Sequence, residues 1–223
     1  MVIFFYFLFF ILSTNVNSRS SLGAERYEPL TGKSLQKDLK GQWDLLYGRS
    51  GFVYGKKPAK FLSENYHLIK ERGRVLDVGM GEGRNAVYLS SKGFNVTGID
   101  ISSVAIKKAE ILAKEFRTSI QTIVADAQKY DFKENTFDAI ICFYYVDRSL
   151  ILKLKKWLKP KGYIFYEAYT LEHKLKIKNN QDPDAYYLQK GEPASFFKDF
   201  FIIKDEYFVD EKESKASLVA RKR

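Results

Sequence analysis

Three glycines at alternate positions, Gly79, Gly81 and Gly83, follow the short apolar segment 74–78. Glycine carries no side chain, so such a loop lets the backbone turn sharply and come close to a ligand. Arg84 then opens a segment with helical character. The free N–H groups at a helix N-terminus suit a carboxylate or a phosphate. The pattern predicts a strand, a glycine loop and a helix that together cradle a nucleotide-like ligand.

The spacing within the loop narrows the choice of ligand. A dinucleotide-binding fingerprint needs a further glycine or alanine for close helix-to-strand packing, whereas this loop continues with Glu82, Gly83 and Arg84. A P-loop needs Lys followed by Ser or Thr, and these residues are missing at the required positions. Both nucleoside triphosphates and dinucleotides are therefore disfavoured.

The sequences D-V-G-M-G-E-G at 77–83 and G-I-D at 98–100 resemble motifs I and II of the class I S-adenosylmethionine-dependent methyltransferases. That family places the methionine end of its cofactor on the glycine loop and the ribose hydroxyls on the acid that ends the second strand. Asp77 and Asp100 match the acidic positions of the two motifs. The resemblance implies S-adenosylmethionine as the cofactor, and the alternative is a Rossmann-like turn that binds another ligand.

A third apolar segment, 119–125, is followed by Asp126 and Ala127. In the family the acid at this position hydrogen-bonds the adenine amino group, and the alternative is a plain turn residue. The resemblance therefore implies that the cofactor contacts the following residues: Asp77, Gly79, Gly81, Gly83, Asp100, Ile101, Asp126, Ala127 and Phe143.

The segment 136–145 is almost continuously apolar, as expected for a central parallel strand. Ligands bind at the carboxyl ends of such strands, so the end of this segment should face the reactive centre. Its aromatic rings can hold a sulfonium by cation–π attraction. The alternative is that the rings only pack in the core, and this alternative fits Phe143 better than Tyr144. Methyl transfer from an activated donor needs no dedicated acid–base pair. If the acceptor loses a proton, the candidate bases are Tyr144, Asp147, Glu167 and His173, the last on a Lys-rich loop.

The segment 41–61 concentrates aromatic residues ahead of the glycine loop, and a helical run to Arg72 follows. Three short motifs resemble the small-molecule methyltransferases of the tellurite-resistance type: W-x-x-x-Y at 43–47, Y-G-x-x-P at 54–58 and F-L at 61–62. In that family this segment folds over the cofactor and walls the substrate pocket. The resemblance implies a lid over residues 41–72 and a cofactor-binding domain over 73–223. Alternatively, the rings only attach an N-terminal helix to the sheet.

Alternating strands and helices predict one doubly wound α/β domain with a Rossmann-like, seven-stranded, mostly parallel sheet. Ser102 is placed to cap a helix that runs to about Phe116. Lys161 replaces the first glycine of the P-G-G turn that is usual in the family. The remaining expected elements are a helix over 150–158, a turn over 159–162, a strand over 163–169, a short helix within 186–197 and an antiparallel edge hairpin from 200–208 and 217–220.

The composition fits one domain with a well-filled core, because the chain has 223 residues. The net charge of +10 is compatible with an anionic substrate or a nucleic acid, and the alternative is a lysine bias spread over helix faces. Cys142 is the only cysteine, so no intrachain disulfide or cysteine zinc cluster can form. With His67 and His173 as the only histidines, no structural metal is expected.

The apolar run Val2–Leu12 has the length of a signal-peptide core, and small residues lie near a cleavage point at 16–18. Three interpretations of residues 1–18 stay open: a cleaved signal peptide, a short membrane anchor with the domain on the cytoplasmic side, or residues added by an upstream start codon. The catalytic domain is expected where S-adenosylmethionine is available, on the cytoplasmic side. The polar segment 19–40 is expected to be a linker.

The sequence predicts transfer of a methyl group from S-adenosylmethionine to a small-molecule acceptor, with a soft or oxygen nucleophile implied by the resemblance. An RNA or protein methyltransferase would instead use the basic surface. The Asn-Pro-Pro-Tyr-type motif of amino-directed enzymes is absent after the strand 136–145, which argues against base amino groups. A non-catalytic cofactor-binding or scaffold protein is the alternative from another class. The chain is expected to be a monomer or a weak dimer and to contact a membrane only through its N-terminal segment.

Overall fold

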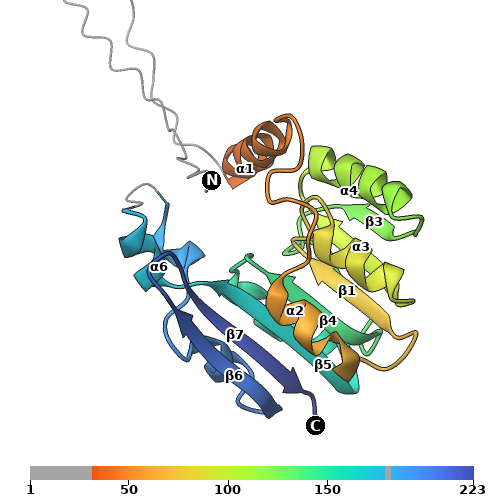
Figure 1. The fold of residues 1–223 in the computed structure, drawn as a ribbon, viewed down its shortest axis with the longest axis vertical. Coiled ribbons are helices and arrows are strands. Elements are labelled where there is room, and N and C mark those ends of the chain that lie inside the picture. The colour runs from red at the N-terminus through yellow and green to blue at the C-terminus, as the bar shows by residue number, and fades with distance from the viewer. Residues whose placement is uncertain (1–31, 179–181) are drawn as a thin grey trace, which may run out of the picture.

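The computed structural model describes residues 32–178 and 182–223 of the chain, with side chains from Leu39 onward. They form one seven-stranded sheet in the order β3-β2-β1-β4-β5-β7-β6 (Figure 1). The α/β architecture, the mostly parallel sheet and the antiparallel C-terminal hairpin are as the sequence predicted.

Five parallel strands form the main part of the sheet: β1 (Arg74–Val78), β2 (Asn95–Asp100), β3 (Gln121–Val124), β4 (Phe137–Phe143) and β5 (Leu158–Tyr169). The C-terminal strand β7 (Ser214–Arg221) runs antiparallel beside β5. The preceding strand β6 (Phe201–Val209) pairs with β7 and forms the edge of the sheet.

The helices lie on both sides of the sheet: α1 (Gly32–Tyr47), α2 (Lys60–Asn65), α3 (Arg84–Ser91), α4 (Ser103–Glu115), α5 (Ile151–Trp157), α6 (Leu171–Lys176) and α7 (Glu192–Phe196). Three short 3₁₀ helices complete the described chain: η1 (Tyr66–Leu68), η2 (Arg148–Leu150) and η3 (Asp184–Tyr186).

The central strands are buried on both faces because side chains alternate along a strand. In β4, Ile140 packs in a cluster with Leu154 and Trp157 of α5, whereas the next residue, Ile141, packs in a second cluster with Leu62 of α2. The near-continuous apolar character of this strand therefore reflects one core on each side of the sheet.

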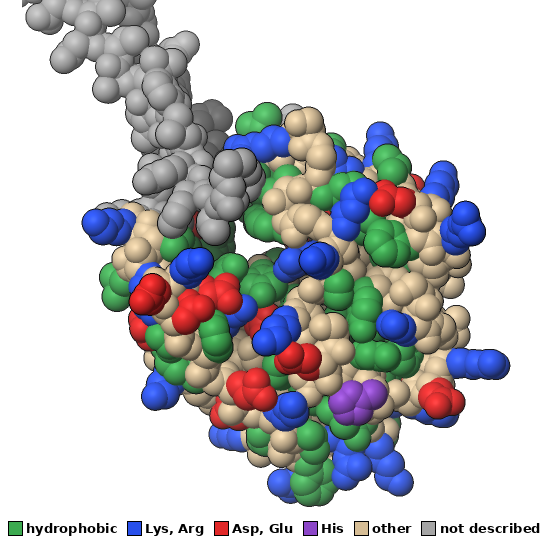
Figure 2. Space-filling model, viewed as in Figure 1, with side chains coloured by type: hydrophobic (Ala, Val, Ile, Leu, Met, Phe, Trp, Pro, Cys, Tyr) green, Lys and Arg blue, Asp and Glu red, His purple; other side chains and the backbone are tan. Residues whose placement is uncertain are grey.

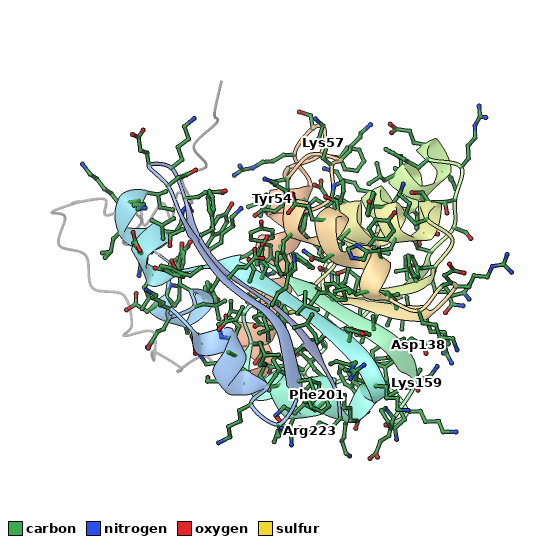
Figure 3. The ribbon with its side chains drawn as sticks, turned by 60° about the horizontal axis from the view of Figure 1, so that its bottom comes forward. Tyr54, Lys57, Asp138, Lys159, Phe201 and Arg223 are labelled. Atoms are coloured by element: carbon green, nitrogen blue, oxygen red, sulfur yellow. The ribbon has the colours of Figure 1, made fainter. Side chains whose placement is uncertain are left out.

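The order in which successive strands are added to the sheet reverses between the parallel neighbours β1 and β4. From β1 the strands run outward to β2 and β3, whereas from β4 they run the other way to β5. Loops at the carboxyl ends of β1 and β4 therefore leave in opposite directions and open a crevice, which is the usual ligand position in such sheets. Tyr54 lies at this end of the sheet, and Asp138 and Lys159 lie at the opposite end (Figure 3).

Several boundaries differ from those expected. Helix α1 begins at Gly32, so it includes the end of the segment that we expected to be a linker. The helical run expected to reach Arg72 ends with η1 at Leu68, and β5 begins at Leu158 rather than after the turn. Lys161 has a φ of 64°, the left-handed conformation that glycine would adopt without strain.

The apolar run at the start of the chain lies outside the described residues, as does most of the expected linker. Among the described residues, no helix is both long enough and apolar enough to cross a membrane.

Candidate functional site

The glycine loop lies at the crevice, between β1 and α3. Gly79, Gly81 and Gly83 have φ values of 66°, 54° and 79°. The N–H groups of Gly79 and Met80 donate to the carbonyl of Ile99, 2.9 and 3.2 Å away, which ties the loop to the end of β2. Since L-residues rarely adopt this backbone conformation, the alternating glycines are required by the path of the loop.

Two of the glycines also leave room for aromatic rings. A Cβ atom on Gly79 would lie 2.7 Å from Cγ of Tyr145, and one on Gly81 would lie 2.8 Å from the hydroxyl oxygen of Tyr47. A Cβ on Gly83 would instead meet the Cβ of Ala109 at 2.6 Å. Gly83 therefore serves the packing of α3 against α4, whereas Gly79 and Gly81 form a narrow cradle below Tyr47 and Tyr145.

Asp77 supplies a carboxylate directly before the loop. Its side chain is 2% exposed, and its Oδ2 atom has no hydrogen-bond partner in the described part of the chain. Burial, and then the nearby charge of Asp100, raise the pKa of Asp77 to about 8, against a backbone hydrogen bond from Ala86 and the charge of Arg84. A buried acceptor atom without a donor suits a ligand that brings a positively charged donor, such as an ammonium group.

Asp100 lies at the end of β2 and is also buried. Its Oδ2 accepts a hydrogen bond from the N–H of Gly81, and its Oδ1 accepts one from the N–H of Ser102, both at 2.8 Å. Burial raises the pKa of Asp100, and the two backbone hydrogen bonds oppose this shift. The bonds fix the carboxylate against the glycine loop, and each oxygen can accept a further hydrogen bond from a sugar hydroxyl.

Three other residues expected at the cofactor lie near the strand ends. Asp126 follows β3 and accepts a hydrogen bond from the N–H of Gln128 at 2.9 Å, as in the turn that was the alternative interpretation. Ala127 is buried in the core, and the side chain of Phe143 is buried in the cluster that includes Phe61. The roles of these residues, and of Ile101 after β2, toward a cofactor stay predictions.

Tyr144 and Glu167 form a hydrogen-bonded pair at the carboxyl ends of β4 and β5. The hydroxyl of Tyr144 donates to Oε1 of Glu167 at 2.7 Å, and the hydroxyl of Ser217 in β7 donates to Oε2 at 2.7 Å. Glu167 is only 3% exposed. Burial, and then the charge of Glu167, raise the pKa of Tyr144, so its phenol stays protonated and its oxygen can accept a hydrogen bond. Tyr144 has a φ of 59°, a strained conformation of the kind often found at functional sites.

His173 is linked to this pair by the ring of Tyr169, which contacts both His173 and Tyr144. The rings of Tyr169 and His173 stack with centroids 4.0 Å apart, and the Tyr169 ring lies 5.0 Å from that of Tyr144. The expectation that His173 lies on a loop is wrong, because it belongs to the short helix α6. Its Nδ1 atom is buried without a partner among the described residues, and burial lowers the pKa of His173, which favours the neutral ring.

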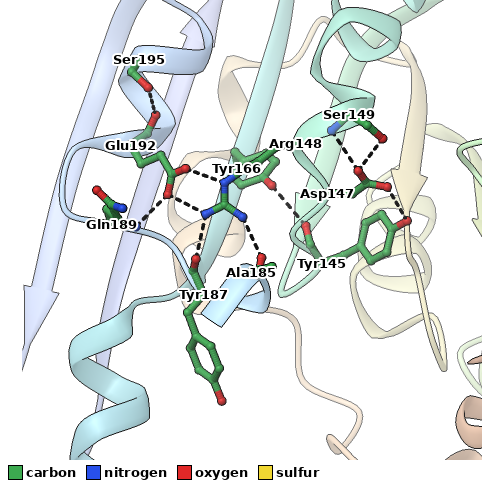
Figure 4. A network of polar contacts seen from close by, with 10 residues as sticks. All are labelled: Tyr145, Asp147, Arg148, Ser149, Tyr166, Ala185, Tyr187, Gln189, Glu192 and Ser195. Carbon is green, nitrogen blue, oxygen red and sulfur yellow. Dashed lines mark hydrogen bonds and ion pairs between the residues drawn. The ribbon is translucent and has the colours of Figure 1, made fainter. Parts of the chain in front are cut away.

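Asp147 is separate from these candidates and has a structural role. Its Oδ1 atom accepts hydrogen bonds from the N–H and the hydroxyl of Ser149, at 2.9 and 2.7 Å, and so caps η2 (Figure 4). Its Oδ2 accepts from the amide of Gln128 at 2.5 Å and from the hydroxyl of Tyr145 at 3.5 Å. These contacts hold the chain after β4 and fix the ring that lies on Gly79.

Arg148 ties the same turn to the C-terminal part of the chain. Its guanidinium binds the carboxylate of Glu192 with two hydrogen bonds, at 2.7 and 3.0 Å, and donates to the carbonyls of Ala185 and Tyr187 (Figure 4). A bidentate Arg–carboxylate pair is geometrically specific. The turn after β4 is therefore held in one position relative to α7 and η3.

The N-terminal segment is fastened over the glycine loop by Glu82, which is itself part of the loop. Its carboxylate accepts hydrogen bonds from the N–H of Val53 at 2.7 Å and from Nζ of Lys108 at 3.0 Å. Lys108, in α4, also donates to the carbonyls of Arg49 and Gly51, at 2.7 and 2.6 Å. Asn85 adds a bond from the N–H of Ala59 to its side-chain oxygen at 2.9 Å.

Helix α1 is attached to the start of α4 by Asp44. The Oδ1 atom of Asp44 accepts from the hydroxyl of Ser102 at 2.6 Å and from the N–H of Val104 at 3.2 Å. The hydroxyl of Ser102 accepts in turn from the N–H of Ala105, so Ser102 caps α4 as predicted. Asp44 also pairs with Lys40 in its own helix.

Aromatic rings from this segment cover the loop. Tyr47 is buried and stacks on Trp43, with centroids 5.8 Å apart, and meets Tyr54 edge-on at 6.3 Å. The guanidinium of Arg84 lies 5.3 Å from the centre of the Tyr144 ring, and Arg84 donates to the carbonyl of Tyr54 at 3.4 Å. The molecule is hollowed between the part that carries α1 and the part that carries α6 (Figure 2). The site is thus an aromatic crevice with buried carboxylates at its base.

The sequence did not predict the residues that hydrogen-bond the N-terminal segment to the rest of the domain: Asp44, Glu82, Asn85 and Lys108. Glu82 and Asn85 lie next to residues that were identified, but nothing in their spacing links them to positions some 30 residues away in the chain. Only Glu82 could have indicated these contacts from the sequence, because a buried carboxylate inside the glycine loop needs a hydrogen-bond donor from another segment.

Comparison with known proteins agrees with this geometry. Residues 75–162 match the family model described as a methyltransferase domain. A ubiquinone biosynthesis O-methyltransferase of Rickettsia akari is 30% identical over 146 residues, 61% of this chain and 55% of the relative. One from Vibrio cholerae is 28% identical over 150 residues, 63% of this chain and 59% of the relative. The chain thus spans a little over half the length of these curated relatives.

Solved structures share the fold. TehB from Haemophilus influenzae superposes with a TM-score of 0.62 at 20% identity, covering 82% of this chain and 67% of that one. The PH0226 protein of Pyrococcus horikoshii gives a TM-score of 0.60 at 23% identity, with 73% of this chain and 86% of that one covered.

The glycine loop between two buried acids, at the switch point of a mostly parallel seven-stranded sheet, defines a class I methyltransferase fold. Residues 75–162 accordingly match a methyltransferase domain, in agreement with the resemblance seen in the sequence. The family and the fold imply S-adenosylmethionine as the cofactor. The unpartnered Oδ2 of Asp77 and the glycine cradle fit its ammonium and methionine end.

Proposed function

We propose that this protein transfers the methyl group of S-adenosylmethionine to a small-molecule acceptor. The observation that carries the proposal is the pair of buried acids, Asp77 and Asp100, on either side of a loop that only glycine can form. Burial raises the pKa of both carboxyl groups, and the charge of Asp100 raises the pKa of Asp77 further, which costs stability in the free protein. Such an arrangement is expected where a ligand supplies the missing donors.

Each part of the cofactor has a counterpart in the crevice. Asp77 would accept a hydrogen bond from the ammonium group, the glycine loop would hold the methionine end, and Asp100 would accept from the ribose hydroxyls. Asp126 binds the adenine amino group, with Ile101 and Ala127 beside the base. S-adenosylmethionine supplies a methyl group on a sulfonium, which is already activated.

The acceptor binds at the ends of β4 and β5. The rings of Tyr47, Tyr54 and Tyr144 exclude water and align the acceptor, and alignment alone can account for a large part of the rate. Tyr144 donates to Glu167, so the phenol oxygen is free to accept a proton donor. An acceptor hydroxyl or thiol can pass its proton to Tyr144 as Tyr144 passes its own to Glu167.

We favour an oxygen nucleophile as the acceptor group. The Rickettsia akari and Vibrio cholerae relatives are named as O-methyltransferases, and the Tyr144–Glu167 pair is suited to removing a proton from a hydroxyl. His173 is the alternative base, because its Nδ1 atom is buried, burial lowers its pKa and so favours the neutral ring, and the ring is stacked on Tyr169. Asp147 is not assigned this role, since its contacts with Ser149 and Gln128 give it a structural role as the cap of η2.

Calorimetric titration with S-adenosylmethionine tests the cofactor assignment. We expect Asp100→Ala to weaken binding at least about 100-fold, since it removes a buried hydrogen-bonding carboxylate from the site. Asp199→Ala, at a half-exposed acid that pairs with Lys155 of α5, is the control and should bind as the native chain does. Undiminished binding by Asp100→Ala contradicts the assignment.

A screen with radiolabelled methyl donor tests the activity. Label is expected in phenols, catechols or other small hydroxyl compounds. Label in RNA or protein, with a steep dependence of affinity on salt, would identify a macromolecular methyltransferase instead. Cofactor binding without transfer to any acceptor would support a non-catalytic protein.

The lid over 41–72, the cytoplasmic position of the domain and the role of residues 1–18 belong to the same proposal. The contacts of Glu82, Asn85 and Asp44 support a segment that covers the site. Fractionation of cells that express the full chain, with mass analysis of its N-terminus, separates a cleaved signal peptide from a retained anchor.

A further inference from the structure

Strand β6 leaves one long edge of the sheet open. It pairs with β7 on one side, and no other strand of the described chain pairs with its outer edge. Natural proteins usually shorten or cover such edges, because unpaired N–H and C=O groups attract other strands. Here the edge is nine residues long and carries five exposed large apolar side chains: Phe201, Ile202, Ile203, Phe208 and Val209.

Four residues of β6 share one face of the sheet. They are Phe201, Lys204, Glu206 and Phe208, which lie opposite Arg221, Val219, Ser217 and Lys215 of β7. These partners are alternate residues of a strand that pairs with β5 without any shift in register, so they point to the same face. The register of β6 shifts between Ile202 and Lys204, and this irregularity brings Phe201 onto the face of Lys204.

The order of this row is self-complementary. Read in either direction, it is an aromatic ring, a charge, the opposite charge and an aromatic ring, centred on Asp205, which lies opposite Leu218. The two rings are nearly equally exposed, Phe201 at 48% and Phe208 at 47%. Each has a cation over its ring, from Arg221 and Arg223 at Phe201 (Figure 3) and from Lys215 at Phe208.

We propose that the outer edge of β6 pairs antiparallel with the β6 edge of a second copy of the chain. A two-fold axis through Asp205 places Phe201 beside Phe208 of the partner subunit, and Lys204 beside Glu206 of the partner subunit. Each contact occurs twice, as in any isologous interface. Cross-strand aromatic pairs and opposite charges both stabilise antiparallel strands, and the edge gains its missing backbone hydrogen bonds. The two sheets continue as one across the interface.

The centre of this interface also limits its strength. Asp205 lies directly opposite the same residue of the second copy, and like charges in that position are destabilising. The dimer is therefore weak and depends on the concentration of the protein. Asp205→Asn removes the repulsion without changing the shape of the side chain, and should tighten dimerisation about threefold to tenfold in sedimentation velocity measurements on the full chain.

A cysteine cross-link tests the register. Antiparallel partners have Cα atoms about 4.5–5.5 Å apart, within the range that a disulfide spans. Asp205→Cys should therefore form an intermolecular disulfide rapidly when diamide is added. Lys212→Cys, in the β6–β7 turn, is the matched control and should cross-link at the slow rate of random collision. The native Cys142 is buried and common to both variants.

A charge exchange tests the pairing itself. Lys204→Glu places two pairs of like charges across the axis, so dimerisation should weaken at least about tenfold. The double variant Lys204→Glu with Glu206→Lys restores both pairs and should recover the native affinity. Lys212→Glu makes the same change in net charge away from the strand and should have no effect.

Two results would overturn the proposal. One is that Asp205→Cys cross-links no faster than Lys212→Cys, or that neither variant cross-links. The other is an association that responds equally to Lys204→Glu and Lys212→Glu, since net charge or residues outside β6 would then explain it. Each variant should unfold at the same temperature as the native chain, because all of the substituted side chains are on the surface. Thermal unfolding therefore checks that each variant is folded.

Discussion

Two aspartates on neighbouring strands of the sheet show how differently its two ends are built. Asp138 lies at the amino end of β4, where it accepts hydrogen bonds from Nζ of Lys159 and from the N–H of Arg74, both at 2.9 Å. Burial would raise its pKa, but these two donors outweigh burial and the pKa of Asp138 is lowered. Asp77 lies toward the carboxyl end of β1 with one oxygen unpartnered among the described residues, and burial raises its pKa to about 8.

The difference separates structural acids from acids that await a ligand. At the amino end the chain supplies every donor itself, so the carboxylate contributes to stability. At the carboxyl end the chain buries Asp77 without a cation, which costs stability unless another molecule supplies the donor. A carboxylate that the fold leaves incomplete is therefore a better indicator of the site than a carboxylate that is merely buried.

The largest effect is expected from a methyl group in the cradle. Gly79→Ala puts a Cβ within 2.7 Å of the Tyr145 ring at a φ of 66°, so we expect cofactor affinity to fall more than about 100-fold. Gly93→Ala, at a φ of 89° with no atom within 4 Å, is the control at the other end of α3. It should lose about 1 kcal/mol of stability and bind normally, as measured by calorimetry and thermal unfolding. Equal binding losses would contradict a ligand site at the loop.

Removing the hydroxyl of Tyr144 should act on the reaction rather than on cofactor binding. Tyr144→Phe keeps the ring near Arg84 but breaks the bond to Glu167, so kcat should fall about 100-fold while the Kd for S-adenosylmethionine changes little. Tyr130→Phe is a control, because this ring packs against Phe132 and the core and not against Tyr144 or Glu167. A fall in affinity equal to the fall in kcat would mean that Tyr144 holds the cofactor.

The two aspartates should also differ in how they respond to pH. If the ammonium of the cofactor pairs with ionised Asp77, its affinity should rise as pH rises toward about 8, by up to about tenfold per pH unit. Below this pH, binding releases a proton, which calorimetry in buffers of different ionisation enthalpy detects. Asp77→Asn should abolish both effects, whereas Asp138→Asn should leave them intact. A Kd that is constant from pH 6 to about 8 would show that Asp77 is not the acceptor.

The same substitution has an expected effect on stability. The pKa of Asp77 is higher in the folded chain than in the unfolded one, so folding binds a proton between about pH 4 and pH 8. The free energy of unfolding should therefore decrease as pH rises through this range. Asp77→Asn should make the decrease smaller, as denaturant titrations at several pH values can show.

The smallest effect concerns two residues with positive φ, Lys161 and Asn135, which both lie beside Lys222 at the amino end of the sheet. Lys161 has a φ of 64° and lies at the amino end, far from the site, so Lys161→Gly should raise the free energy of unfolding by about 0.5–1 kcal/mol. Activity should be unchanged. Asn135→Gly, at a φ of 51°, is the control and should gain little, because Asn tolerates this conformation. A gain equal to that of Lys161→Gly would show that strain is not the cause.

Local patterns in the sequence predicted much of the fold and the shape of the glycine loop. The glycine loop with the acid before it, and the acid at the end of β2 with the cap at Ser102, are each defined by residues within a few positions of one another. The strands were recognisable because buried parallel strands are continuously apolar, as β4 is. The edge hairpin followed from two further β-prone segments at the end of the chain.

Contacts between distant segments could not be predicted in the same way. The bonds from Glu82 to Val53 and Lys108 join three elements, and no local pattern specifies which donors meet a given acceptor. The short helix around His173 has only six residues, too few for its periodicity to stand out in a Lys-rich segment. Asp147 was placed correctly after β4, but its partners Gln128 and Ser149 decide that it caps a turn.

The bonds from Tyr144 and Ser217 to Glu167 join three adjacent strands, β4, β5 and β7. A side chain held in this way moves only if the sheet itself deforms, so the proton-accepting group keeps one position whatever molecule enters. Changes of acceptor preference in related chains should then arise mainly in the covering segment before the glycine loop. In the proposed reaction β7 supports the proton-accepting pair through the bond from Ser217 to Glu167, so removal of β7 should abolish activity through this bond as well as through lost packing.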